Sequence, residues 1–292
     1  MVGRMLDAFI LPVIGQLAHA VWGVLPIVAT LAVAFTVLHW VAEPCNPGLP
    51  WYRKPGLVTD FIFMFFLPIV GGWMRVVLLV GGAMAVYGLW EPAEIERFVA
   101  GGHGPLAGLP FWVQAVAYVI GTDIIMYWTH RTFHGASLWP YHAIHHASEH
   151  LEWTSGARFH PINIVFHSVL ADVVLLLLGV PPTVLAVLGP FNVAMSALVH
   201  ANLDWTFGPF RYVVASPVFH RWHHTDPARG GSMNFAPTFP VIDLVFGTFY
   251  MPKGELPDRY GVDHPMPEGF LGQMAFPFRR DPASSSDPLP ER

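Results

Sequence analysis

The run INIVFHSVLADVVLLLLGVPPTVLAVLGPFNVAMSALV, residues 162–199, is apolar throughout most of its length. It is long enough to cross a membrane twice, because one crossing takes about 20 residues. It is broken once, at Gly179-Val180-Pro181-Pro182. Proline lacks a backbone N–H and disfavours the helical conformation of the residue before it. We therefore predict a helical hairpin that enters and leaves the membrane on the same side.

Three histidine clusters flank this hairpin, two before it and one after it. They are His130-x3-His134, His142-x2-His145-His146 and His220-x2-His223-His224, and His160 and His200 stand between them. Residues three or four apart lie on one face of a helix. Because a hairpin returns the chain to the side from which it started, the three clusters can meet at one membrane face.

Further apolar runs precede the first cluster at residues 21–41, 57–90 and 111–128. We expect the second of these to be either one tilted span with an interfacial piece or a tight helical pair. Charged residues make up 12% of the chain, about half the 25% that is usual in soluble domains. These features predict an all-α fold, an integral membrane helical bundle with several crossings.

The distribution of charge predicts the orientation of this bundle. Arginines lie among the histidine clusters, whereas the loop at residues 91–110 carries three glutamates and one arginine. By the positive-inside rule we expect the histidine-rich face to lie in the cytoplasm, in a bacterial inner membrane. The net charge of −5 and the lack of a basic run argue against a nucleic acid partner.

We expect three regions along the chain. Residues 1–110 form N-terminal transmembrane helices that begin with an uncleaved N-terminus. Residues 111–251 form a catalytic domain that includes the hairpin at about 162–199. Residues 252–292 form a C-terminal extension that is disordered from about residue 280, where Pro, Ala, Ser, Asp and Glu predominate.

The clusters predict a metal centre, because neutral imidazole is the commonest metal ligand in proteins. A structural zinc needs four ligands and a catalytic zinc three, so eight to ten histidines fit two metals that each keep an open position. The lone Cys45 excludes an iron–sulfur cluster held by cysteines. Two redox metals beside a large apolar surface suggest oxygen activation for a lipid substrate.

The three clusters resemble the histidine boxes of the fatty acid hydroxylase/sterol desaturase superfamily. Other matching features are Asp123 and Tyr127, Arg158-Phe-His160-Pro161, His200-Ala-Asn202, Asn234-Phe235 and Asp243-Leu-Val-Phe-Gly-Thr-Phe-Tyr250. The resemblance covers roughly residues 111–251. It implies a di-iron centre at the cytoplasmic end of a helical membrane domain, which uses O2 to hydroxylate or desaturate an unactivated C–H bond of a lipid.

Position in the boxes implies the metal ligands. They are His130, His134, His142, His145, His146, His220, His223 and His224, with His160 and His200 as additional family histidines. We expect no catalytic side chain beyond these ligands. Metal-bound histidines usually donate their second ring N–H to a nearby acceptor, and Asp123, Asn202 and Asn234 are candidates for that role. Asp123 could instead pair with a helix hydroxyl such as Thr122 or Thr129.

The predicted partners follow from what the chain lacks. It has no Gly-x-Gly-x-x-Gly dinucleotide fingerprint and no haem-attachment motif, so we expect an external electron donor of the ferredoxin or cytochrome b5 type. The lipid would come from the bilayer. Alternatives are a sterol or carotenoid desaturase or hydroxylase of the same family, a membrane zinc hydrolase, and a metal-binding transporter.

Overall fold

The computed structural model describes residues 11–226 and 229–279, with backbone only for residues 11–21 and 101. The predicted start of the chain and the predicted disordered tail from residue 280 lie outside the described residues. Within them the regular structure is helical, apart from one isolated bridge between Thr225 and Tyr260. The predicted all-helical fold is confirmed.

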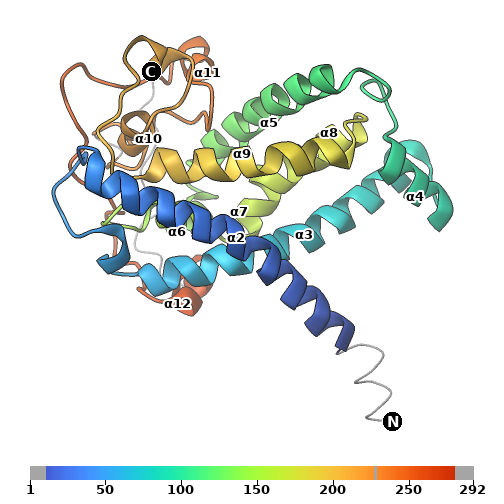
Figure 1. Ribbon diagram of the computed structural model, residues 1–292, viewed down its shortest axis with the longest axis horizontal. Coiled ribbons are helices and arrows are strands. Elements are labelled where there is room, and N and C mark those ends of the chain that lie inside the picture. The colour runs from blue at the N-terminus through green and yellow to red at the C-terminus, as the bar shows by residue number, and fades with distance from the viewer. Residues whose placement is uncertain (1–10, 227–228, 280–292) are drawn as a thin grey trace.

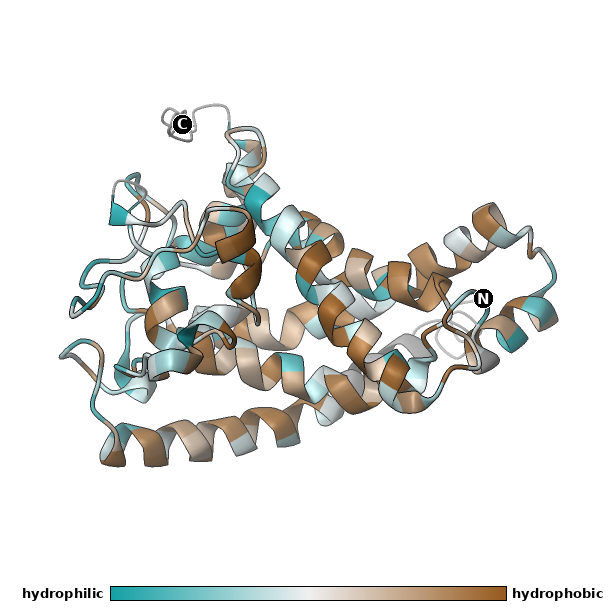
Figure 2. Ribbon diagram, turned by 90° about the horizontal axis from the view of Figure 1, so that it is seen from above, coloured by the Kyte–Doolittle hydropathy of each residue, from teal (hydrophilic) through white to brown (hydrophobic). Residues whose placement is uncertain are grey.

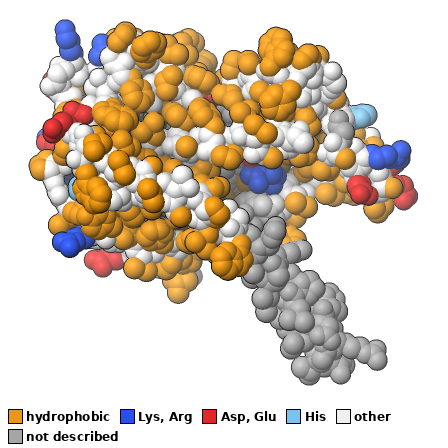
Figure 3. Space-filling view, viewed as in Figure 1, with side chains coloured by type: hydrophobic (Ala, Val, Ile, Leu, Met, Phe, Trp, Pro, Cys, Tyr) orange, Lys and Arg blue, Asp and Glu red, His pale blue; other side chains and the backbone are white. Residues whose placement is uncertain are grey.

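Four helices are long and apolar enough to cross a membrane. They are α2 (Leu11–Val41), α3 (Leu57–Tyr87), α5 (Phe111–Phe133) and α9 (Pro182–His200), and in α2 the apolar window begins at Trp22. Figure 1 shows α2 crossing α3, with the first part of α2 extending away from the other helices. Their surface is largely hydrophobic, as Figures 2 and 3 show, and charged side chains gather toward the two ends.

The run at residues 57–90 is not a tight helical pair. It is one continuous helix, α3, which is a single candidate span, and the short helix α4 (Pro92–Gly101) follows it. Gly71 and Gly72 do not break α3, although glycine inside a helix costs about 1 kcal/mol. A Cβ at Gly71 would make only an ordinary contact, 3.7 Å from Val169, and one at Gly72 would meet nothing within 4 Å. With 31 residues, α3 is about 46 Å long, so it exceeds the hydrocarbon thickness of about 30 Å.

The segment that was predicted as a hairpin consists of four helical pieces. They are α7 (Pro161–Ile164), the π-helix η4 (Val165–Val169), α8 (Leu170–Leu177) and α9. The chain reverses after α8, at Gly179, whose φ of +102° suits glycine. A Cβ there would lie 2.6 Å from the Ala107 nitrogen. Helix α5 contacts both α8 and α9.

Short helices form a cap at one end of the long ones. They are η2 (Trp51–Arg53), α6 (Trp139–His146), η3 (Trp153–Ala157), η5 (Gly208–Tyr212), α10 (Pro217–His223), α11 (Val241–Val245), α12 (Phe270–Ala275) and η7 (Phe276–Phe278). In Figure 1 α6, α10, α11 and α12 lie at the end opposite α4. Helix α10 starts sharply because Ser216 accepts a hydrogen bond from the Phe219 N–H and Pro217 occupies the first turn.

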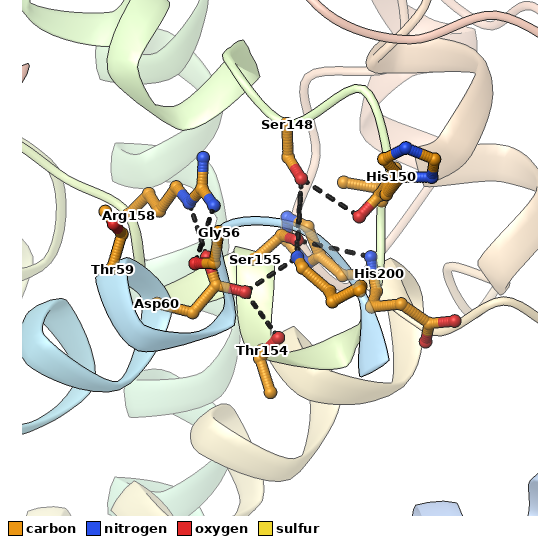
Figure 4. A network of polar contacts seen from close by, with 12 residues as sticks. Gly56, Thr59, Asp60, Ser148, His150, Thr154, Ser155, Arg158 and His200 are labelled. Carbon is orange, nitrogen blue, oxygen red and sulfur yellow. Dashed lines mark hydrogen bonds and ion pairs between the residues drawn. The ribbon is translucent and has the colours of Figure 1, made fainter. Parts of the chain in front are cut away.

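A buried ionic network ties the start of α3 to this cap (Figure 4). Asp60 pairs with Lys54 at 2.7 Å and also accepts from Arg158 and Thr154. Lys54 donates in turn to Ser155. Burial lowers the pKa of Lys54, and the carboxylate of Asp60 opposes that effect. Because removing one partner of a buried pair is strongly destabilising, this network holds η3 against α3.

Candidate metal centre

Nine histidines gather into two groups in the cap. The five-histidine group contains His130, His134, His142, His146 and His223, and the four-histidine group contains His145, His200, His220 and His224. Within each group the candidate ligand atoms lie within 4.8 Å of one another, and all nine side chains are buried. The groups adjoin, since the rings of His146 and His224 stack at 4.4 Å between centroids.

The two short helices α6 and α10 each contribute to both groups. Helix α6 gives its i, i+4 pair, His142 and His146, to the five-histidine group and His145 to the other. Helix α10 and its C-cap do the reverse: His220 and His224 enter the four-histidine group and His223 the five-histidine group. Neighbouring helical residues point about 100° apart, so each of these short elements lies between the two groups.

The four-histidine group has the spacing of a metal site. The Nε2 of His200 lies 3.2 Å from that of His145 and 3.1 Å from those of His220 and His224. A metal that binds imidazole nitrogen at about 2.0–2.1 Å separates neighbouring ligand atoms by roughly 3 Å. Burial lowers the pKa of His145, His220 and His224 well below 6.5. These rings are therefore neutral and have lone pairs available for a cation.

Hydrogen-bond acceptors orient the rings. His130 Nδ1 donates to the Phe235 carbonyl at 2.8 Å, and His223 Nδ1 donates to the Met233 carbonyl at 2.7 Å. Each such bond leaves Nε2 as the lone-pair nitrogen, as in metal-bound histidines. The Nε2 atoms of His130, His134 and His223 are buried without a hydrogen-bond partner among the described residues. An unsatisfied buried acceptor costs about 1–3 kcal/mol, so the donor set fits a bound metal.

Two further acceptors lie behind the groups. His142 Nδ1 bonds to Asn163 Oδ1 at 2.8 Å, and His200 Nδ1 to the Ser196 carbonyl at 2.6 Å. The sequence analysis did not predict Asn163 as an acceptor for a histidine ring. The one feature that could have indicated it is its position three residues after His160. The backbone acceptors at Ser196, Met233 and Phe235 carry no signal in the sequence.

Among the described residues, none of the three predicted supporting residues hydrogen-bonds to a histidine ring. Asp123 accepts from the Phe239 N–H at 2.9 Å and also interacts with Thr238 of the same loop. Asn202 exchanges two hydrogen bonds with the backbone of Asn46. Asn234 binds the Phe219 carbonyl and the backbone of Tyr250. Backbone carbonyls accept from His130, His200 and His223, and Asn163 accepts from His142, whereas the three predicted side chains fix loops.

Asn234 and Asp243 still act on the site through the loop that carries Met233 and Phe235. Asp243 accepts from the Phe235 and Ala236 N–H groups and from Thr248. Burial raises the pKa of Asp243 to about 6, against the effect of these donors. Asn234 has a φ of +61°, a conformation that asparagine tolerates better than most residues. Together they hold the carbonyls that receive the N–H groups of His130 and His223.

His160 lies outside both groups. Its Nδ1 accepts from the Ile162 N–H at 3.1 Å and caps α7, and its ring contacts Tyr141 and Phe278. A residue directly before a proline at a helix start is well placed for capping. The structure therefore does not bring His160 to the other nine, and we leave it out of the ligand set.

A cavity of about 350 Å³ leads from the histidines into the long helices. His130 of one group and His145, His200 and His220 of the other line its inner end. Apolar residues of α2, α3, α5 and α9 line most of the rest, including Val28, Leu31, Met64, Leu67, Met126 and Met195. It extends to Val193, which is exposed on α9. An alkyl chain could therefore reach both histidine groups from the apolar surface.

A second cavity of about 460 Å³ reaches the five-histidine group from the polar cap. His146 and Trp139 lie at its inner wall, and Glu149, Asp258 and Tyr260 line its outer part. The site is thus bordered by an apolar cavity and by a polar one.

Residues 115–248 match the protein family described as fatty acid hydroxylase. The chain contains a fatty acid hydroxylase domain. The resemblance drawn from the histidine boxes is therefore confirmed. All nine grouped histidines and the loop at residues 233–248 lie inside this fatty acid hydroxylase domain.

Curated relatives share this part of the chain. Ornithine lipid hydroxylase OlsE of Rhizobium tropici is 34% identical over 173 residues, which are 58% of this chain and 52% of that protein. Alkylglycerol monooxygenase of Danio rerio is 31% identical over 160 residues, 53% of this chain and 34% of that protein. Very-long-chain aldehyde decarbonylase GL1-6 of Oryza sativa subsp. indica is 29% identical over 176 residues, 51% of this chain and 26% of that protein. The matches thus span about half or less of these relatives, and no solved structure matches the chain.

Proposed function

We propose that the protein is a membrane-bound di-iron oxygenase that hydroxylates an unactivated C–H bond of a lipid, with O2 and electrons from an external donor. The observation that carries this proposal is the position of two buried histidine groups at the inner end of an apolar cavity. The names of two relatives, a lipid hydroxylase and an alkylglycerol monooxygenase, support it.

The nine grouped histidines are the ligands that we propose, five for one metal and four for the other. Their donor set is nitrogen only, and imidazole suits iron, copper, zinc and nickel alike. Iron, once bound, would supply the one-electron and O2 chemistry that removal of hydrogen from an alkyl carbon requires. The same relatives favour a redox metal over the zinc of a hydrolase.

The protein's own contribution is to bind and position the lipid. The cavity wall holds the alkyl chain by apolar contact, at about 25 cal/mol per Å² of buried surface. His130 and His220 face the cavity from different groups, so a carbon at its inner end lies beside both. The buried Trp153 packs against Phe35 and Trp51 and closes the wall against water.

We further propose that the histidine face lies in the cytoplasm of a bacterial cell, and that a ferredoxin or cytochrome b5-type protein supplies the electrons. Among the arginines near the clusters, Arg158 and Arg221 are buried and Arg229 is exposed. Arg229 pairs with the exposed Asp258 at 2.7 Å, so the exposed Arg53 is the residue that would add positive charge to that face.

Lipid analysis with heavy O2 tests this function. Cells that express the protein should contain a lipid heavier by one labelled oxygen, and a loss of two hydrogens would indicate desaturation instead. His145→Ala removes a member of the four-histidine group and His223→Ala a member of the five-histidine group, so each should abolish the product. The matched control is His150→Ala, because His150 is exposed and belongs to neither group. Product formation by either ligand variant would refute the proposal.

A further inference from the structure

Asp123 is the unusual residue in the wall of the apolar cavity. It belongs to α5, which is long and apolar enough to cross a membrane, and it lines the cavity and is 2% exposed. Its carboxyl interacts with Thr238, and its Oδ2 accepts from the Phe239 N–H, whereas its Oδ1 is buried without a hydrogen-bond partner among the described residues. A carboxylate within a membrane span is costly unless its oxygens are satisfied. The fold therefore leaves one acceptor available beside the cavity.

The position of Asp123 relative to the histidines is fixed by α5. Asp123 and His130 are seven residues apart, close to two helical turns, so they share a face and lie about 10 Å apart along the axis. Both line the same cavity. A lipid whose polar group binds Asp123 would therefore place beside the metal ligands only a carbon that lies within about 10 Å of that polar group.

Other buried carboxylates in this region differ from Asp123. Asp172 on α8 receives hydrogen bonds from Tyr118 and Arg75 on its two oxygens, and it does not line the cavity. The two oxygens of Asp243 accept from Phe235, Ala236 and Thr248. Asp123 thus combines contact with the cavity and an unpartnered oxygen.

We propose that Asp123 is a substrate-positioning residue that accepts a hydrogen bond from a hydroxyl or amino group of the lipid. This inference rests on the proposed function, and it narrows the substrate class. The lipid carries a hydrogen-bond donor within about 10 Å of the oxidised carbon, as distinct from a hydrocarbon chain oxidised far from any polar group.

Binding without turnover tests this inference. The metal-loaded protein in detergent micelles is titrated by calorimetry under nitrogen with two probes, a long-chain 1-O-alkylglycerol and its di-O-methyl ether. The probes share their chain, but only the first has hydroxyl donors. A hydrogen bond to an otherwise unsatisfied buried acceptor predicts that the wild type binds the diol about 10-fold tighter.

The variant Asp123→Asn should bring this affinity ratio to about one. Its amide oxygen can still accept from the Phe239 N–H, and the other position becomes a donor. Asp172→Asn is the matched control, and it should keep the wild-type ratio because Asp172 does not line the cavity. Equal affinity of the wild type for both probes would overturn the inference even if no variant folds.

The same inference would also be overturned if Asp123→Asn kept the wild-type ratio, and histidine-dependent oxygen insertion would then still support the proposed function. Conversely, the protein could prefer the diol in an Asp123-dependent way and yet add no oxygen to lipids. That result would support the binding site and refute the proposed function.

Discussion

Substitution of Asn163 tests most directly whether hydrogen bonds that orient the histidine rings contribute to metal affinity. Asn163 is fully buried, and its Oδ1 accepts from His142 Nδ1 at 2.8 Å. Asn163→Leu keeps a similar volume and removes the acceptor, so the buried N–H of His142 is left unsatisfied. That costs about 1–3 kcal/mol, which corresponds to about 5- to 150-fold in metal affinity if the loss falls on the bound state.

The assay is a chelator competition that resolves two binding steps, with cobalt as a spectroscopic probe of the nitrogen ligands. Only the step that belongs to the five-histidine group should weaken in Asn163→Leu, because His142 is a member of that group alone. Asn192→Leu is the matched control. Asn192 lies in the cavity wall and donates weakly to Tyr118, so its loss should leave both steps unchanged. Two unchanged steps in Asn163→Leu would refute the reasoning, and equal weakening of both would show general loss of structure instead.

Two other substitutions give separate predictions. A Cβ at Gly156 would lie 2.9 Å from His200 Nδ1, so Gly156→Ala should selectively weaken metal binding by the four-histidine group. Gly189→Ala on α9 is the control, because a Cβ there would have nothing within 4 Å, and it should leave metal binding unchanged. Equal metal affinities of the two variants would count against the site. Burial raises the pKa of Glu152 from 4.5 to about 7, so its contribution to stability is complete below pH 4.5 and is lost as the pH rises through 7. Glu152→Gln should therefore remove up to about 3 kcal/mol of the decline in unfolding free energy between pH 5 and 8, and a melting-temperature profile as steep as that of the wild type would contradict this.

The spacing of the histidines on one short helix already divides them between two directions. An i, i+4 pair shares a helix face, and a third histidine one position away points elsewhere. This is how α6 divides its histidines, with His142 and His146 in one group and His145 in the other. The division into five and four could not be predicted in full, because His200 comes from α9 and its group depends on how the hairpin packs.

The hydrogen bonds that orient the histidine rings could not be predicted from the sequence, for a different reason. The rings of His130, His200 and His223 donate to backbone carbonyls, and every residue has such a carbonyl. Asn202 and Asn234 stood out in the sequence as candidate acceptors for ring N–H groups, but their side chains hydrogen-bond to loop backbone instead. The continuity of α3 was likewise undetermined, because two adjacent glycines are compatible with both a bent pair and a single packed helix.

The central claim is that two metals occupy two adjoining histidine groups. Anomalous scattering from crystals of the iron-loaded protein, measured at the iron edge, tests it most directly. The account predicts two iron peaks per chain, one among the Nε2 atoms of the four-histidine group and one inside the five-histidine group. A single peak, or a peak that lies outside these nine histidines, would contradict it.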